Sequence, residues 1–196
     1  NIMGFYRGPN IVTDGLLFAY DAGSERCYPG TGTSTTNIMS QASPGALQNG
    51  VGFNTANGGF WEFDGVDDKI AITNFPTSVF NGPCTMEAWV YWNDDSRSII
   101  IGNYNPTSSG GDINYEKNPN GDLRFYWDRG SANAFSGSGA VAIGEWQHVV
   151  IVRDVSANAV KFYVNGSLIT TVSGQAGSNV STTADTYKIG ADSRNG

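Results

Sequence analysis

The chain has 196 residues, 26 of them glycine, and carries a formal net charge of −7 at pH 7. The negative charge and the lack of any lysine or arginine cluster exclude duplex nucleic acid as a partner, because phosphate binding needs a basic face. No apolar run approaches the length of a membrane span, and the first residues lack the apolar segment of a secretion signal, so we expect no membrane insertion.

The N-terminal residues 1–15 are predicted to form an extended arm, because Gly8-Pro9 and Asp14-Gly15 interrupt regular structure. Between these two dipeptides, residues 11–13 are expected to pair as a short edge strand. The apolar residues 16–20 predict the first strand of the globular domain.

The next segment is poor in apolar residues. Glycine, serine, threonine and asparagine dominate residues 23–59, which predicts mostly loop with one short strand. Residues 60–63 then lead into a turn, and residues 69–72 are expected to follow as their hairpin partner. Residues 85–92 alternate strictly between two faces, as a half-buried strand does.

The second half of the chain shows further short strands with turn residues between them. Asn118-Pro119-Asn120-Gly121 and Asn165-Gly166 are strong hairpin signals. Strands are expected at residues 98–101, 112–116, 123–127, 148–153, 160–164, 167–172 and 187–190. About a dozen short strands predict an all-β fold, a single two-sheet antiparallel β-sandwich or jelly roll over residues 16–196.

Four motifs occur in a defined order along the chain. They are Phe63-Asp64-Gly65-Val66-Asp67-Asp68, Thr85-Met86-Glu87-Ala88-Trp89-Val90, Gly144-Glu145-Trp146-Gln147-His148-Val149-Val150 and Val160-Lys161-Phe162-Tyr163-Val164-Asn165-Gly166. Together they resemble the laminin G-like and pentraxin-like branch of the concanavalin A-like lectin/glucanase superfamily. Relatives usually continue after a glycine-rich loop like residues 192–196 into one closing strand, which is absent from this sequence. Either the chain continues beyond these residues, or the arm or another subunit fills the open edge.

The resemblance also raises the question of catalysis. The stretch from Glu62 to Asp67 is similar to the Glu-x-Asp-x-x-Glu strand of laminarinase-type glycoside hydrolases, which use two carboxylates. Here position 67 is aspartate rather than glutamate, and Gly65 breaks the strand, so a tight turn is the better interpretation. His148 is the only histidine and is expected to pack or lie on the surface. We therefore expect no catalytic residue, with a glycan hydrolase as the least favoured alternative.

Calcium is the metal that the resemblance allows. In the pentraxin branch one site joins two loops, which hold Asp112 and Asp192 here, with Asn103 as a weaker candidate. The acidic cluster in the second loop is thinner than in that branch. A separate structural site is the alternative use of Asp64, Asp67 and Asp68, and solvated turns are the default. No cofactor is assigned, and calcium is left open.

Glycan binding would need exposed aromatic rings beside polar loop residues, since aromatic faces stack on sugar CH groups. The candidate residues are Trp92, Asn103, Tyr104, Tyr115, Tyr126 and Trp127, flanked by Asn105, Asn114 and Asp128. The alternative for each aromatic residue is packing in the core. The two cysteines, Cys27 and Cys84, lack a metal-binding or redox spacing, and the sequence leaves a disulfide between them undecided.

The N-terminal segment indicates a biological context. Residues 5–17 and 28–32 resemble the lead-in to this domain in tailed-phage structural proteins. The resemblance implies a non-enzymatic virion protein (a head fibre, capsid decoration or tail-fibre module) that assembles in the host cytoplasm. Its arm would bind other virion proteins, its copies would form a homo-oligomer, and the sandwich would bind host-surface glycans. A purely structural particle protein without a glycan ligand is the alternative.

Overall fold

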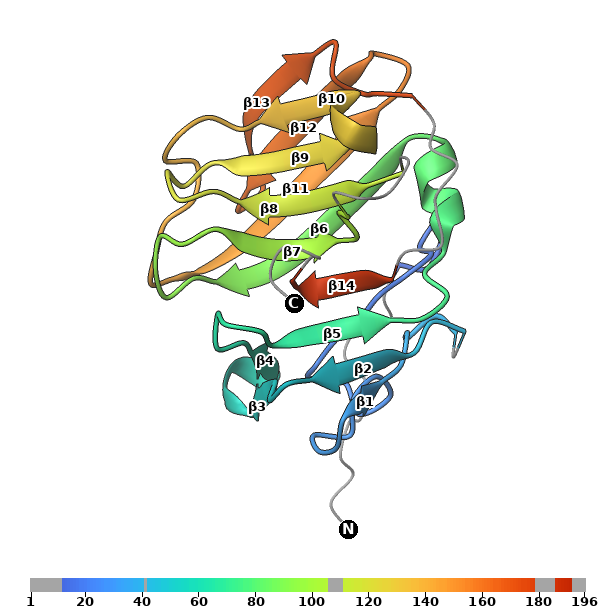
Figure 1. Ribbon diagram of the computed structural model, residues 1–196, viewed down its shortest axis with the longest axis vertical. Coiled ribbons are helices and arrows are strands. Elements are labelled where there is room, and N and C mark those ends of the chain that lie inside the picture. The colour runs from blue at the N-terminus through green and yellow to red at the C-terminus, as the bar shows by residue number, and fades with distance from the viewer. Residues whose placement is uncertain (1–11, 41, 106–110, 179–185, 192–196) are drawn as a thin grey trace.

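The computed structural model describes residues 12–40, 42–105, 111–178 and 186–191. These residues form antiparallel strands and short 3-10 helices, with no α-helix among them (Figure 1). None of the described helices is long or apolar enough to cross a membrane. The prediction of an all-β antiparallel sandwich is confirmed.

The larger sheet has eight strands, which follow one another from the bottom to the top of Figure 1. In spatial order they are β1 (Ser34–Thr35), β2 (Gly45–Gln48), β5 (Lys69–Ile72), β14 (Tyr187–Gly190), β7 (Ser98–Gly102), β8 (Ile113–Lys117), β9 (Leu123–Trp127) and β10 (Ala132–Phe135).

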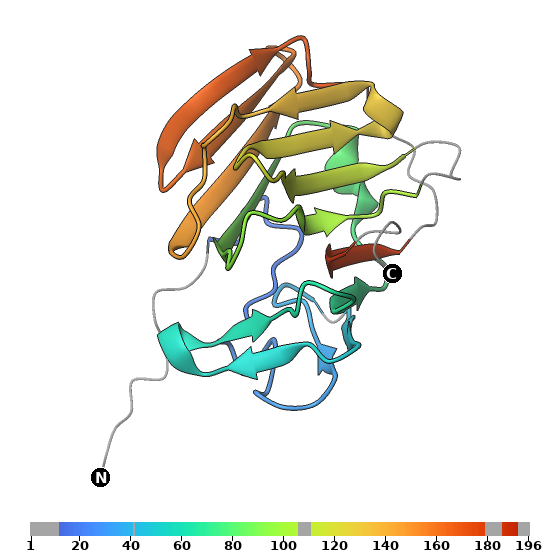
Figure 2. The same cartoon turned by 60° about the vertical axis from the view of Figure 1, so that its left-hand side comes forward.

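The smaller sheet has four strands and covers one face of the β7–β10 half of the larger sheet (Figures 1 and 2). In spatial order they are β13 (Ser167–Ser173), β12 (Ala159–Val164), β11 (Trp146–Asp154) and β6 (Cys84–Tyr91). A separate hairpin pairs β3 (Gly52–Asn54) with β4 (Phe60–Glu62). The 3-10 helices are η1 (Ala56–Gly58), η2 (Thr77–Asn81) and η3 (Asp128–Gly130).

Strand β14 lies inside the larger sheet. Its Tyr187 is opposite Ile72 of β5, and its Lys188 is opposite Gly102 of β7. The strand expected at residues 187–190 is therefore confirmed, and it joins the two halves of the sheet. The closing strand expected beyond residue 196 stays a prediction.

The main core fills the space between the two sheets. Alternation places Ile113, Tyr115 and the inward residues of β9 and β10 on the inner face of the larger sheet. From the smaller sheet they meet the apolar positions of β6, β11 and β12, which are Met86, Ala88, Val90, Val149, Ile151, Val160, Phe162 and Val164. Burial of this continuous apolar layer is the main stabilising contribution to the sandwich.

A second, smaller core lies under the β3–β4 hairpin. Tyr28, Leu47 and Ile70 are its buried residues, and the ring of Tyr28 meets those of Phe53 and Trp61 at centroid distances of 5.1 and 5.7 Å. This aromatic cluster fixes the N-terminal loops against β2 and β5.

Several N-terminal predictions are wrong. Residues 12–20 form no strand: the Ala19 amide donates a hydrogen bond to the side-chain oxygen of Asn37 and not to the backbone of a neighbouring strand. Residue 11 lies outside the described residues. The segment 23–59 contains three strands instead of one. Residues 60–63 and 69–72 are not hairpin partners, because β4 pairs back with β3 and β5 pairs with β2 and β14.

Candidate functional site

Three of the aromatic residues expected to bind a glycan are part of the core. Trp92, Tyr115 and Trp127 are 6%, 0% and 0% exposed. The indole N–H of Trp127 donates to the carbonyl of Ser178 at 2.7 Å, so the polar edge of this ring is also satisfied internally. These rings cannot stack on a sugar from solvent, and this part of the prediction is corrected: all three are buried in the main core of the sandwich.

Asn103 is also removed from the surface. It is 3% exposed, and its side-chain amide donates to the carbonyl of Gly111 at 3.3 Å while its oxygen accepts the amide of Ile113 at 2.8 Å. These bonds join the residue after β7 to the start of β8. Its role is therefore to hold backbone, not to contact a glycan.

Tyr104 and Tyr126 remain at the surface, both half-buried. Their rings meet edge to face at a centroid distance of 5.5 Å. The structure thus brings together two of the six candidate residues and separates them from the buried ones.

Both tyrosines belong to a surface that we call the polar face. It is the side of β8, β9 and β10 that points away from the smaller sheet, extended by two residues beside β7. Its residues are Asn114, Glu116, Arg124, Tyr126, Asn133 and Phe135 from the strands, together with Arg97 and Tyr104.

A buried carboxylate organises the polar face. Glu116 is fully buried and forms two ion pairs, from Oε2 to Nη2 of Arg97 at 2.6 Å and from Oε1 to Nη1 of Arg124 at 2.8 Å. Asn114 also donates to Oε2 at 3.2 Å. Because both carboxylate oxygens are used, the two guanidinium groups are held in fixed positions near the surface.

Arg124 is held on its other sides as well. Its Cζ lies 4.7 Å from the ring centroid of Tyr126 and 5.5 Å from that of Phe135, and its Nε donates to the side chain of Asn133 at 2.7 Å. Planar stacking and hydrogen bonding together make a rigid group of one guanidinium and two rings.

Gly102 of β7 leaves room for a side chain of the polar face. It pairs with Asn114 of β8, and a Cβ at position 102 would collide with the side-chain oxygen of Asn114. The neighbouring Lys188 lies on the side of β14 opposite the core residue Tyr187, and so continues the polar face toward β5.

A second aromatic surface lies on the outer side of the smaller sheet. This aromatic face consists of Trp89, Tyr91, Trp146 and His148; Trp89 is 67% exposed and Tyr91 44%. The His148 ring lies 5.2 Å from that of Trp89, with Nε2 3.4 Å from a carboxylate oxygen of Glu87. The alternation of β6 places Trp89 and Tyr91 on one face, and neither residue was predicted to bind a glycan.

The expected calcium site at Asp112 and Asp192 stays a prediction. Asp112 is 1% exposed, and its carbonyl accepts the amide of Asp128 at 2.6 Å. Asp192 lies outside the described residues. The side-chain oxygen of Asn103, the weaker candidate, already accepts a backbone amide. Of the two expected carboxylates, the structure describes Asp112, and this residue lies inside the fold.

The stretch resembling a hydrolase strand is divided between a hairpin and a turn. Glu62 ends β4 and accepts a hydrogen bond from the Asn54 side chain at 3.1 Å. Asp64 accepts the amides of Val66 and Asp67 at 2.8 and 3.3 Å, which lowers the pKa of its carboxyl group. The turn interpretation is confirmed. Asp64 does come close to Asp67 and Asp68, with one oxygen of each within 4.8 Å of the others.

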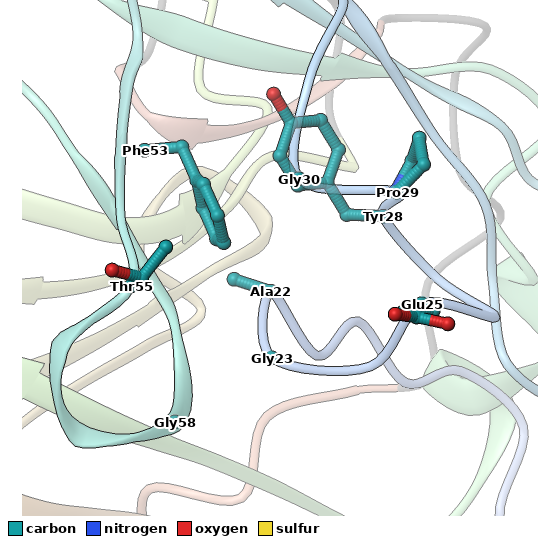
Figure 3. A pocket seen from close by; sticks show the side chains of 9 residues that line it. All are labelled: Ala22, Gly23, Glu25, Tyr28, Pro29, Gly30, Phe53, Thr55 and Gly58. Atoms are coloured by element: carbon teal, nitrogen blue, oxygen red, sulfur yellow. The ribbon is translucent and has the colours of Figure 1, made fainter.

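A pocket of about 200 Å³ opens between the loop 22–30 and the β3–β4 hairpin (Figure 3). The rings of Tyr28 and Phe53 form one wall, and Glu25 and Thr55 lie on opposite sides of the view. Its lining offers a single carboxylate, whereas glycoside hydrolysis uses two.

Comparison with known proteins identifies a family. Residues 63–196 match the Laminin_G_3 family model, described as concanavalin A-like lectin/glucanases superfamily. Among curated proteins no significant sequence match was found.

Solved structures share the fold at low sequence identity. Domain 4 of AbnA, a GH43 extracellular arabinanase from Geobacillus stearothermophilus in complex with arabinotriose, is 14% identical with a TM-score of 0.59, over 80% of this chain and 78% of that one. An S-layer domain-containing protein from Clostridium thermocellum is 18% identical with a TM-score of 0.50, over 84% and 74%.

Carbohydrate-binding structures also appear at lower similarity. The Ruminococcus gnavus IT-sialidase CBM40 bound to α2,3 sialyllactose is 15% identical with a TM-score of 0.44, over 56% of this chain. This chain spans 63% and 66% of two structures of that module, less than two thirds in each case.

Proposed function

Because the chain belongs to the concanavalin A-like lectin/glucanases superfamily, we propose that it is a non-catalytic domain that binds carbohydrate through the polar face. The observation that carries this proposal is the rigid arrangement of Arg124 between Tyr126 and Phe135, anchored by the buried Glu116. Domain 4 of AbnA, which has a similar fold, was solved with a bound oligosaccharide and supports the ligand class.

The chemistry of the polar face suits sugars. Aromatic rings such as Tyr126 offer an apolar surface for sugar CH groups, and the arginine and asparagine side chains offer donors for hydroxyl oxygens. Since the ion pairs already fix the arginines, ordering them on binding costs little conformational entropy. Burying the carboxylate of Glu116 beside two arginines has an unfavourable desolvation free energy. A role in ligand binding would explain why these charged residues lie at a surface that faces solvent.

The same arrangement supports binding without catalysis. Among the described residues that make up the polar face, Glu116 is the only carboxylate, and both of its oxygens are in ion pairs with arginines. Hydrolysis of a glycosidic bond needs a second carboxylate within about 5–10 Å of the first.

The proposal places this domain on a phage particle, where its arm joins it to other virion proteins and its copies form an oligomer. The support is the resemblance of residues 5–17 and 28–32 to phage structural proteins. Arrayed copies would raise the avidity for host-surface glycans by about 10²–10⁴ over a single site. Immunogold labelling of particles, with an antibody against this domain, tests the location.

The binding proposal is tested on a glycan array and on host cells, in calcium and again in EDTA. Tyr126→Ala is expected to weaken binding roughly tenfold, because it removes one stacking ring. The matched control is Trp89→Ala, which truncates an exposed ring on the opposite sheet and is expected to leave binding unchanged. Unfolding midpoints of both variants verify that they fold.

The outcomes separate the alternatives. Loss of binding in Trp89→Ala alone would move the sugar site to the aromatic face. Binding that persists in EDTA would show that no metal is required. A multivalent display that binds no glycan would contradict the proposal and favour a purely structural particle protein.

A further inference from the structure

The loop that joins β4 to β5 gathers three carboxylates. One oxygen each from Asp64, Asp67 and Asp68 lies within 4.8 Å of the others. Within the part of the chain that the structure describes, no lysine or arginine forms an ion pair with any of them. Three like charges at this separation repel one another unless a cation lies between them.

Asp68 supplies a second and independent observation. It is 6% exposed, and its Oδ2 accepts the amide of Asp64 at 2.9 Å, so the carboxylate points into the loop. Its Oδ1 is buried and has no hydrogen-bond donor among the described residues. A Cβ at Gly50 would lie only 3.3 Å from this oxygen, so the turn after β2 closes over it. A buried carboxylate oxygen without a partner is unfavourable, and a bound cation would satisfy it.

We propose that this loop is a calcium site, with Asp64, Asp67 and Asp68 as its side-chain ligands. Calcium accepts carboxylate oxygens in irregular geometry, and waters and backbone carbonyls complete its shell. The carboxylate of Asp67 is exposed and makes no hydrogen bond with any residue that the structure describes, and it is therefore available as a ligand. Magnesium demands near-octahedral ligands and fits three carboxylates on one short turn less well.

The position of the loop gives the ion a structural consequence. The side-chain amide of Asn49 donates to the carbonyl of Asp67 at 2.8 Å, so the loop is bonded to the turn after β2. At the other side, a Cβ at Gly190 would meet the ring of Phe63 and, at 3.1 Å, the carbonyl of Asp68. Calcium would therefore stabilise the contact of this loop with both β2 and the end of β14.

The test is calorimetric titration of the EDTA-treated chain with calcium chloride, together with thermal unfolding at each concentration. We expect one ion per chain with a Kd of about 10⁻⁴–10⁻³ M, a higher unfolding midpoint with calcium, and weaker binding of magnesium. Asp67→Asn should weaken calcium binding at least roughly tenfold, because it removes one charge while the backbone bonds of the turn remain.

Asp94→Asn is the matched control. Asp94 is exposed, as Asp67 is, and like Asp64 it accepts a backbone amide two residues ahead, from Ser96 at 2.8 Å, but it is not part of the cluster. Its variant should bind calcium as the unmodified chain does. Equal affinities of the Asp67→Asn and unmodified chains, or no heat and no midpoint shift up to about 10 mM calcium, would overturn the proposal. These readouts involve no glycan and are independent of the proposed carbohydrate binding.

Discussion

The guanidinium group of Arg153 lies over the indole ring of Trp127, with its Cζ 4.3 Å from the ring centroid. Both side chains are fully buried. Arg153 also donates to the carbonyls of Gly82 at 2.6 Å, of Ala176 at 2.6 Å and of Gly177 at 2.9 Å. Burial lowers the pKa of this arginine, and the carbonyls compensate for the lost hydration. Arg153 thus holds the loop at Gly82 and the loop at residues 176–177 against the inner face of the sandwich.

Arg153→Lys is expected to lower the free energy of unfolding by about 2–4 kcal/mol, because an ammonium group cannot donate in all these directions or stack on the indole. Urea unfolding followed by tryptophan fluorescence measures this loss. Arg26→Lys, at an exposed position, is the control and should leave the midpoint unchanged. An unchanged midpoint in Arg153→Lys would show that the network contributes no stability.

Glu116→Gln is expected to destabilise the fold by about 1–3 kcal/mol, since it removes the negative charge that pairs with both Arg97 and Arg124. The effect is smaller than for a fully buried pair, because the side chains of Arg97 and Arg124 are 24% and 19% exposed. The variant should also bind glycan more weakly, as Arg124 is no longer fixed. Urea unfolding and the glycan array measure the two effects. Equal stability of the variant and the unmodified chain would argue against an organising role for Glu116.

The ion pair between Asp154 and Lys161, 2.9 Å apart, predicts a pH-dependent stability. The hydrogen bond from Lys161, followed by those from the Ala157 amide and the Ser156 hydroxyl, holds the pKa of Asp154 well below its usual range. Because the pKa of Asp154 is lower in the folded chain than in the unfolded chain, its carboxylate stabilises the fold at pH values above the unfolded pKa of about 4. This stabilisation is lost as the pH falls through the folded pKa. The Asp154 contact raises the pKa of Lys161, so its contribution is present below the unfolded value and lost at higher pH.

The stability difference between the unmodified chain and Asp154→Asn should therefore be largest between about pH 5 and pH 10 and shrink on both sides. Urea unfolding across this range measures it. In a Lys161→Met background, the same substitution should have a smaller effect near neutral pH. A difference that does not vary with pH would contradict the assignment.

Both cysteines are free thiols in the structure, which resolves the alternative left open by the sequence. Burial raises the pKa of Cys84 to about 11, and Cys27 is 2% exposed with its sulfur 3.2 Å from the amide of Asp21. Iodoacetamide at about pH 8 should alkylate Cys84 slowly in the folded chain because the thiolate is the reactive form, and Cys27 slowly because it is buried. In urea both should react rapidly. Failure to label the unreduced chain in urea would indicate a disulfide instead.

Local patterns predicted most of the strands, whereas pairing over distance was harder to predict. The alternation of residues 85–92 specified β6, and the turn signals at 118–121 and 165–166 specified the β8–β9 and β12–β13 hairpins. The turn at 64–68 looked like a hairpin connection, yet β4 and β5 belong to different sheets. A turn signal indicates where the chain reverses and does not specify which strand becomes the partner.

The candidate site was only partly predictable for a related reason. Tyr126 and Trp127 are adjacent in a strand and must point to opposite faces, but the sequence does not say which face meets the second sheet. Glu116, Arg97 and Arg124 come from three separate segments. The register of β8 with β9 places Arg124 opposite Glu116, and the pairing of β7 with β8 brings Arg97 to the same carboxylate. The exposure of Trp89 could have been predicted from the sequence. In its strand Met86, Ala88 and Val90 share one face, and Trp89 lies on the other face together with the charged Glu87.

The interior position of β14 affects the order in which the chain can fold during synthesis. On the ribosome, β5 and β7 emerge long before residues 187–190, which join them in the finished sheet (Figure 1). Until then the facing edges of β5 and β7 expose unpaired backbone groups, which nascent chains on neighbouring ribosomes can bind. Production of this domain is therefore expected to depend on translation rate and on chaperones that shield these edges.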